Sequence, residues 1–170
     1  MEEKMSQETV RDLFEFAVIG ERIMQDYYYG LVEKFSHLAE ISNFWKDLAI
    51  DEARHMAVLA ESKKSIGEDI LSSKASPAIT ENIKDSLKFS AANMLNSVNN
   101  LNDAYELAHE MEYSEINSLF KFLTASLISS PGKQNDAIFL IDSHLAKLMD
   151  FSKNFGDAQW RKDIRVAGLH

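Results

Sequence analysis

Apolar residues recur at intervals of three and four along most of this chain, which is the spacing of a helix with one buried face. The periodicity predicts four long helices, at residues 8–36, 40–65, 84–129 and 134–154. Helix breakers are rare, because the 170 residues include only two prolines and six glycines. We therefore expect an all-α fold.

The connections between the predicted helices are short, long and short. Residues 36–39 separate the first two helices, and residues 129–132 separate the last two. Between the second and the third, residues 66–82 contain Gly67, Pro77 and several serines, which indicates an irregular crossover. This pattern is typical of a four-helix bundle made of two antiparallel helix hairpins joined by a long crossover.

The third stretch is too long for one uninterrupted helix of such a bundle. Asparagine and aspartate favour the cap position before a helix, and four of them lie near the middle of this stretch. We expect a helix to restart near residue 103, with these candidate caps: Asn99, Asn100, Asn102 and Asp103. The bundle would then occupy residues 8–154, and residues 155–170 would form a peripheral C-terminal tail.

Each apolar stripe contains titratable groups where apolar side chains would be expected. The second stripe contains a Glu-x-x-His pair, whose two side chains leave the same face of a helix. The third stripe is predicted to contain Tyr105, Ala108, Glu112, Glu115, Leu119 and Phe122. The complete set of inward-facing titratable groups is Glu21, Glu52, His55, Glu112, Glu115 and His144.

A weak internal repeat relates the two halves of the chain. The segment Ala17–Glu21 recurs as Ala108–Glu112, and the surroundings of His55 recur around His144. Each half thus contributes a glutamate and then a histidine on the following helix. The repeat supports a bundle made of two similar hairpins.

Four carboxylates in an apolar core would repel one another and lose their hydration, and two imidazoles do not offset this at neutral pH. Two divalent cations would neutralise the carboxylates and use both imidazoles as ligands. Because the sequence contains no cysteine, thiolate zinc sites and iron–sulfur clusters are excluded. A mixture of oxygen and nitrogen ligands suits iron or manganese, so we expect two ions of this kind.

Three segments resemble the first, second and third helices of the rubrerythrin branch of the ferritin-like di-iron proteins. They are residues 17–35, 48–61 and 104–123. The resemblance implies a ferritin-like bundle over most of residues 8–154. It implies iron ligands at Glu21, at Glu52 with His55, and at the glutamate pair Glu112 and Glu115. It also implies a catalytic-centre tyrosine, Tyr28, whose hydroxyl bonds a ligand carboxylate.

One position departs from the family pattern. The fourth helix of these proteins carries a bridging glutamate three residues before the position of His144, and this chain has Ile141 there. The cysteine module of full rubrerythrins is also absent. The resemblance therefore implies an oxidoreductase that reduces peroxide or dioxygen with electrons from an external donor. A site with manganese or with a single ion stays an alternative, as does a non-catalytic bundle with a degenerate site that serves binding or scaffolding.

The charge balance and the lack of long apolar runs limit the kinds of partner that we expect. The 27 acidic and 18 basic side chains give a net charge of −9, which disfavours binding to nucleic acid. No apolar run approaches the roughly 20 residues that span a bilayer, and the amino terminus lacks a secretory signal. We expect a cytoplasmic protein with no nucleic-acid or membrane partner, and a homodimer is compatible with the sequence.

Overall fold

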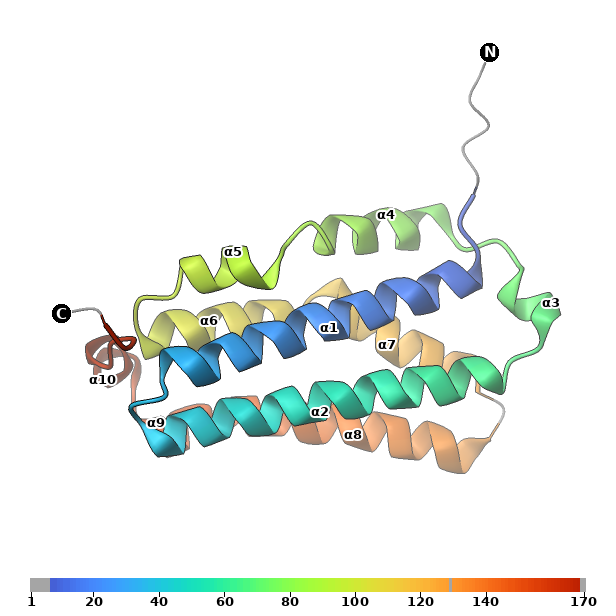
Figure 1. Ribbon diagram of the computed structural model, residues 1–170. Helices are drawn as coiled ribbons and strands as arrows, with labels where there is room; N and C mark the ends of the chain where they lie inside the picture. Colours follow the sequence, from blue (N-terminus) through green and yellow to red (C-terminus); the bar gives the residue numbers. More distant parts are fainter. Residues whose placement is uncertain (1–6, 129, 169–170) are drawn as a thin grey trace, which may run out of the picture.

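The computed structural model describes residues 7–128 and 130–168, apart from the side chains at positions 115, 116 and 126. The described residues form helices and two isolated bridges but no β-strand, which confirms the predicted all-α class (Figure 1). The helices are α1 (Val10–Lys34), α2 (Ala39–Lys64), α3 (Glu68–Leu71), α4 (Pro77–Ser86), α5 (Ala91–Asn96), α6 (Leu101–Glu112), α7 (Glu115–Ser126), α8 (Pro131–Met149), α9 (Phe151–Phe155) and α10 (Ala158–Asp163).

The first two predicted helices are present as α1 and α2, which run antiparallel and side by side (Figure 1). Thr9 and Asp12 form a capping box at the start of α1: the Thr9 backbone N–H donates to the Asp12 carboxylate at 2.7 Å, and the Thr9 side chain accepts from the Asp12 backbone. Each bond satisfies a donor that the first helical turn leaves unpaired. The entry into α1 is therefore determined locally.

The stretch predicted as helical at residues 84–129 is divided into several helices, and its length had already indicated that it would not be continuous. This region contains part of α4 and all of α5, α6 and α7, so the crossover extends from the end of α2 to Asn100. The Asn100 side chain caps α6 by accepting the backbone N–H of Asp103 at 3.0 Å. The expected restart near residue 103 is thus confirmed, because the cap determines where α6 begins.

A second break, between α6 and α7, was not expected from the periodicity. The Asn117 side chain donates to the backbone carbonyl of Glu112, which the end of α6 leaves without a helical partner. Because the break rotates the faces that follow it, Phe122 is 38% exposed instead of lying in the buried stripe. Glu112 and Glu115 consequently belong to two different helices.

The crossover lies against α1 through α4 and α5 (Figure 1). α5 approaches α1 closely at Gly30, where an added Cβ would lie 2.2 Å from a δ-carbon of Leu95. Any larger residue at this position would force α5 away from α1 or displace the leucine.

The segment expected to form a peripheral tail includes α10 and is bonded to the start of α6. The Leu101 backbone N–H donates to the carbonyl of Ile164 at 2.9 Å, and the buried Arg161 donates to the Asn102 side chain at 3.2 Å. α10 and Ile164 therefore pack on the start of α6.

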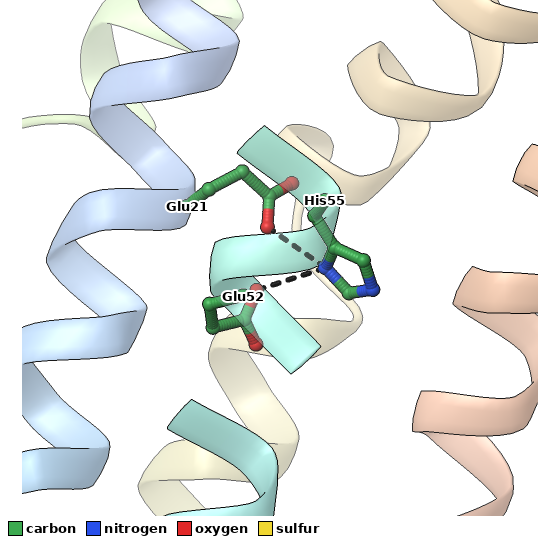
Figure 2. A group of neighbouring side chains, drawn as sticks. All are labelled: Glu21, Glu52 and His55. Carbon is green, nitrogen blue, oxygen red and sulfur yellow. Dashed lines mark hydrogen bonds and ion pairs between the residues drawn. The ribbon is translucent and has the colours of Figure 1, made fainter. Parts of the chain in front are cut away.

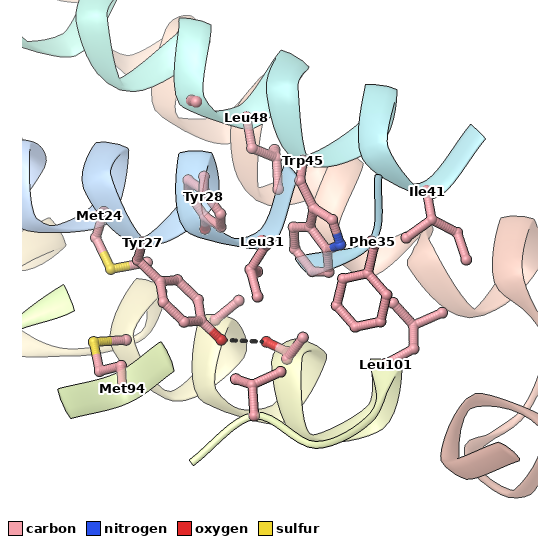
Figure 3. Packing of buried hydrophobic residues seen from close by; sticks show 14 of the residues in the cluster. Met24, Tyr27, Tyr28, Leu31, Phe35, Ile41, Trp45, Leu48, Met94 and Leu101 are labelled. Atoms are coloured by element: carbon pink, nitrogen blue, oxygen red, sulfur yellow. Dashed lines mark hydrogen bonds between the residues drawn. The ribbon is translucent and has the colours of Figure 1, made fainter. Parts of the chain in front are cut away.

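Two hydrophobic clusters fill the interior. The first, which we call the aromatic cluster, includes Tyr27, Tyr28, Leu31, Phe35, Trp45 and Leu48 (Figure 3). Phe151 also belongs to it. The second, which we call the leucine-rich cluster, includes Leu13, Phe14, Leu59, Leu119, Phe120, Leu123 and Ile141. Each fully buried side chain of this size stabilises the fold by about 1.5–3 kcal/mol. Within the described ranges, no helix combines the length and the apolar character that crossing a bilayer requires.

Candidate metal centre

A buried polar layer separates the two hydrophobic clusters. On α1, Glu21 lies between Ala17 of the leucine-rich cluster and Met24 of the aromatic cluster. On α8, His144 lies between Ile141 and Leu148 in the same way. The residues of the layer are at most 4% exposed, and they are Glu21, Asp51, Glu52, His55, Glu112 and His144.

The first half of the layer joins α1 to α2 (Figure 2). His55 Nδ1 lies 3.0 Å from Glu21 Oε2 and 2.9 Å from Glu52 Oε2. Glu52 and His55 stand one turn apart on α2, as the Glu-x-x-His spacing predicts, and Glu21 reaches them from the facing helix. We call these three residues the first triad.

The second half joins α2 to α6 and α8. His144 Nε2 lies 2.9 Å from Glu112 Oε1 and 3.2 Å from Glu52 Oε1. Glu52 therefore belongs to both halves, and we call Glu52, Glu112 and His144 the second triad. In each triad, one ligand atom per residue lies within 4.8 Å of the others. The two imidazole rings are 5.1 Å apart between centroids, so the triads are adjacent.

Several polar atoms of the two triads are buried without a hydrogen-bond partner among the described residues. They are Glu21 Oε1, Glu52 Oε1, His55 Nε2 and His144 Nδ1. The contact of Glu52 Oε1 with His144 Nε2 is close but lacks hydrogen-bond geometry. Each unpaired buried group costs about 1–3 kcal/mol, so an interior that gathers four of them calls for a further partner. Because the atoms come from carboxylates and imidazoles, a divalent cation fits this donor set.

Glu112 has support that Glu21 lacks. The Tyr28 hydroxyl donates to Glu112 Oε1 at 2.6 Å, and Asn117 Nδ2 donates to Glu112 Oε2 at 2.8 Å. Burial raises the pKa of Tyr28 well above its usual value, and the charge of Glu112 adds to this effect. The phenol thus stays a donor, in agreement with the sequence-based expectation that Tyr28 bonds a ligand carboxylate.

Asp51 also borders the second triad, and the sequence did not indicate it. Its carboxylate accepts from Arg54 at 2.8 Å and from Lys147, and its Oδ2 lies 3.5 Å from His144 Nδ1. Burial would raise the pKa of Asp51, but the interactions with His144 and Lys147 outweigh burial and hold this pKa well below its usual range. Its position next to Glu52 was the one available signal, and only the packing of α8 on α2 brings it to His144.

Asn117 was missed for a related reason. It follows Glu112 by five residues, a spacing that would not place both side chains on one face of a continuous helix. The break between α6 and α7 brings them together.

Burial and neighbouring charges divide the protons unequally within the metal-free layer. Burial, followed by repulsion from Glu112 and Glu21, raises the pKa of Glu52 well above its ordinary value. Burial also acts to raise the pKa of Glu112, but His144 and the bonds from Tyr28 and Asn117 outweigh it and lower this pKa to about 2. Burial would lower the pKa of His144, yet Glu112 and Asp51 raise it to about 10. Among these groups, Glu52 is therefore the carboxyl whose protonated form burial and repulsion favour, while near neutral pH His144 is a cation that faces ionised Glu112.

Five of the six predicted ligand residues converge in this layer, from the four helices α1, α2, α6 and α8. Glu115 is the first residue of α7, but its side chain lies outside the described residues. Ile141 is fully buried one turn before His144, so the layer has an apolar side chain at the position where the family pattern has a carboxylate. The role of the converging residues as metal ligands stays a prediction.

No protein-family model matches this chain, and searches of the curated proteins and of the solved structures find no match. The functional argument therefore depends on the residues and their geometry.

Proposed function

We propose that this protein is a ferritin-like di-metal carboxylate protein, and that it acts as a rubrerythrin-like oxidoreductase on peroxide or dioxygen. The observation that carries the proposal is the pair of fully buried triads that share Glu52 and contain four unpartnered polar atoms among the described residues. Such a group is expensive to bury without cations and becomes favourable with them.

The arrangement of the helices supports the ferritin-like part of the proposal. α1 with α2 and α7 with α8 form pairs with short connections, whereas residues 65–100 make the long connection between the pairs. In this assignment α6 and α7 together are the third helix of a four-helix bundle. The broken third helix is a variation of that plan.

Glu21, Glu52 and His55 would hold one ion, and Glu52, Glu112 and His144 would hold the other, so Glu52 would serve both. Bound iron would supply the change of oxidation state that the reduction of peroxide or dioxygen requires. Manganese satisfies the same donor set.

The chain's own residues have four tasks in this proposal. Tyr28 and Asn117 orient the Glu112 carboxylate, and Asp51 orients the His144 ring. Glu52 and His144 release their protons when cations bind. The two hydrophobic clusters on either side keep bulk water out of the layer. Because the sequence contains no cysteine, the electrons come from an external donor.

Metal analysis tests the proposal directly. After anaerobic loading with ferrous iron and removal of excess ion, we expect two ions per chain in the wild type and fewer than one in Glu52→Gln. Glu61→Gln, at an exposed position on the same helix, is the matched control and should keep two. At an ion concentration of about 100 Kd, binding should also raise the free energy of unfolding by about 2.7 kcal/mol per site. Wild-type protein that binds less than one ion would refute the proposal.

A second candidate function is a non-catalytic bundle with a degenerate or single-metal site that serves binding or scaffolding. The buried Ile141 favours it, because this position offers no bridging ligand. The better support of the second triad also favours one ion there. One bound ion and no consumption of peroxide would select this candidate.

A further inference from the structure

A series of aromatic rings in contact leads away from the second triad. The Tyr28 ring, whose hydroxyl bonds Glu112, is stacked on Trp45 with centroids 5.9 Å apart and planes 14° apart (Figure 3). Trp45 in turn lies 5.2 Å from the ring of Phe151. All three side chains are fully buried, so this part of the series is enclosed in the aromatic cluster.

The series continues to the surface along one face of α6. Phe151 is stacked on Tyr105 at 5.0 Å, and Tyr105 lies 5.9 Å from the ring of His109. His109 is stacked on Tyr113 at 4.5 Å, and Tyr113 is 52% exposed. The buried triad and the solvent are thus joined by rings without a gap.

The polar atoms of these rings suit one-electron chemistry. When a tyrosine loses an electron its phenol loses a proton, and the Tyr28 hydroxyl already donates to a carboxylate oxygen at 2.6 Å. The indole N–H of Trp45 is buried and has no hydrogen-bond partner among the described residues. An oxidised Trp45 therefore keeps its proton, and its charge can pass on without waiting for a proton transfer.

We propose that this ring series carries single electrons from a one-electron donor at the Tyr113 surface to the metal centre. The need for such electrons rests on the proposed function. The donor is a one-electron redox carrier, which is required because the chain has no cysteine-based cofactor of its own.

The electrons and protons balance at each step. Tyr28 gives one electron to the oxidised centre and its hydroxyl proton to Glu112, which leaves a neutral phenoxyl radical. Trp45 returns one electron to Tyr28 while Glu112 returns the proton, and Trp45 becomes a radical cation. Tyr113, which is 52% exposed, then gives one electron to Trp45 across the intervening rings and its phenol proton to the solvent. The donor, oxidised by one electron, returns an electron to Tyr113 while the solvent returns the proton, and Phe151, Tyr105 and His109 are not themselves oxidised.

The guanidinium of Arg161 raises the energy needed to oxidise one ring of this series, Tyr105. Its central carbon lies 4.8 Å from the centroid of Tyr105, and a nearby cation makes it harder to remove an electron from that ring. An oxidising equivalent is therefore held on Trp45 and Tyr28 until the donor supplies an electron.

The experiment uses the full chain without added metal, so that it does not depend on the proposed function. Because the natural sequence has no cysteine, Glu110→Cys creates a single thiol on the exposed face of α6, three residues before Tyr113. A ruthenium polypyridyl photo-oxidant is attached there, and transient absorption after a flash records the indole radical. We expect that radical to form in the labelled protein, and to be absent when the label is instead attached at Lys133→Cys, an exposed position on α8.

Two tryptophans provide a matched pair of variants. Trp45→Phe should abolish the indole radical, whereas Trp160→Phe, at a half-exposed residue of α10, should leave it unchanged. The opposite result would overturn the proposal. Tyr113→Phe changes only an exposed ring and should slow radical formation severalfold, so an unchanged rate would also overturn it even if Trp45→Phe failed to fold. If the protein passes this test and yet binds no metal, the electron path is supported and the proposed function is refuted.

Discussion

The two triads share Glu52 and differ in what surrounds them. In the second, both oxygens of Glu112 accept hydrogen bonds, from Tyr28 and Asn117, and His144 faces Asp51. In the first, Glu21 Oε1 and His55 Nε2 have no hydrogen-bond partner among the described residues. His144 Nδ1 and Oε1 of the shared Glu52 also lack one in the second, so the difference lies in the bonds from Tyr28 and Asn117 to Glu112. Outer partners hold ligands in place before an ion arrives, and their loss commonly weakens metal binding by 10–100-fold. We therefore expect the second triad to bind its ion first and more tightly.

The difference also separates two ways of tolerating buried charge. The second triad contains an internal ion pair of Glu112 and His144, so it is partly satisfied without metal. The first triad depends on Glu52 keeping its proton, or on a cation. An ion pair therefore holds the second triad together without metal, whereas the first triad needs a bound cation more.

The largest expected effect on the free energy of unfolding comes from replacing, one at a time, the two glutamates that belong to only one triad, Glu112 and Glu21. Glu112→Gln leaves the His144 cation without its main partner, and breaking a buried pair costs about 3–5 kcal/mol. Glu21→Gln keeps an oxygen that can accept a hydrogen bond from His55 Nδ1, and His55 also retains Glu52 as a partner, so this change should cost about 1 kcal/mol in the metal-free protein. Urea unfolding of both metal-free variants measures this difference. Equal losses would show that the two halves are not distinct.

Removal of an outer hydroxyl should affect metal more than folding. Tyr28→Phe deletes a donor to Glu112, and we expect affinity for the tighter ion to fall about 10–100-fold in chelator competition. Tyr27→Phe is the matched control, because its equally buried hydroxyl donates to the backbone of Ala104 instead. The control should lose a similar free energy of unfolding and no metal affinity. If both variants bind metal as the wild type does, Tyr28 has no role in positioning Glu112.

A carboxylate at position 141 should make the two halves more alike. Ile141→Glu adds a fifth acid to the buried polar layer, so the metal-free variant should be less stable by about 1–3 kcal/mol. With metal present, a second shared ligand should tighten the weaker ion and narrow the gap between the two affinities. Calorimetric titration resolves the two binding steps. A gap that widens would place residue 141 outside the centre.

The last prediction is a pH dependence that belongs to the second triad. Because the pKa of His144 is raised from 6.5 to about 10, its contribution is complete below pH 6.5 and is lost as the pH rises toward 10. Because the pKa of Glu112 is lowered from 4.5 to about 2, its contribution is complete above pH 4.5 and is lost as the pH falls toward 2. Urea midpoints of the metal-free protein should therefore decline on both sides of this window. In Glu112→Gln the decline above pH 6.5 should be much weaker.

Much of the candidate centre could be predicted from the spacing of residues on single helices. The period of 3.6 residues places Glu52 and His55 on one face and turns Glu21 and His144 inward. The cap that starts α6 was equally readable, because Asn100 and Asp103 act within one turn. These predictions held because each depends on the geometry of one short segment.

The rest depended on contacts between segments. The break after Glu112 follows from an Asn117 side chain that replaces a helical bond, and periodicity carries no sign of it. The approach of Asp51 to His144 requires α8 to pack on α2 at one particular register.

The sequence by itself determined that this chain is helical and that acids and imidazoles lie on the buried faces, since a helix repeats its faces at a period set by its own backbone. Only the tertiary structure decided that Glu52 joins both triads, and that Tyr28 and Asn117 support one of them. Which side chains meet across a helix interface depends on the offset between helices, and packing against distant segments sets that offset.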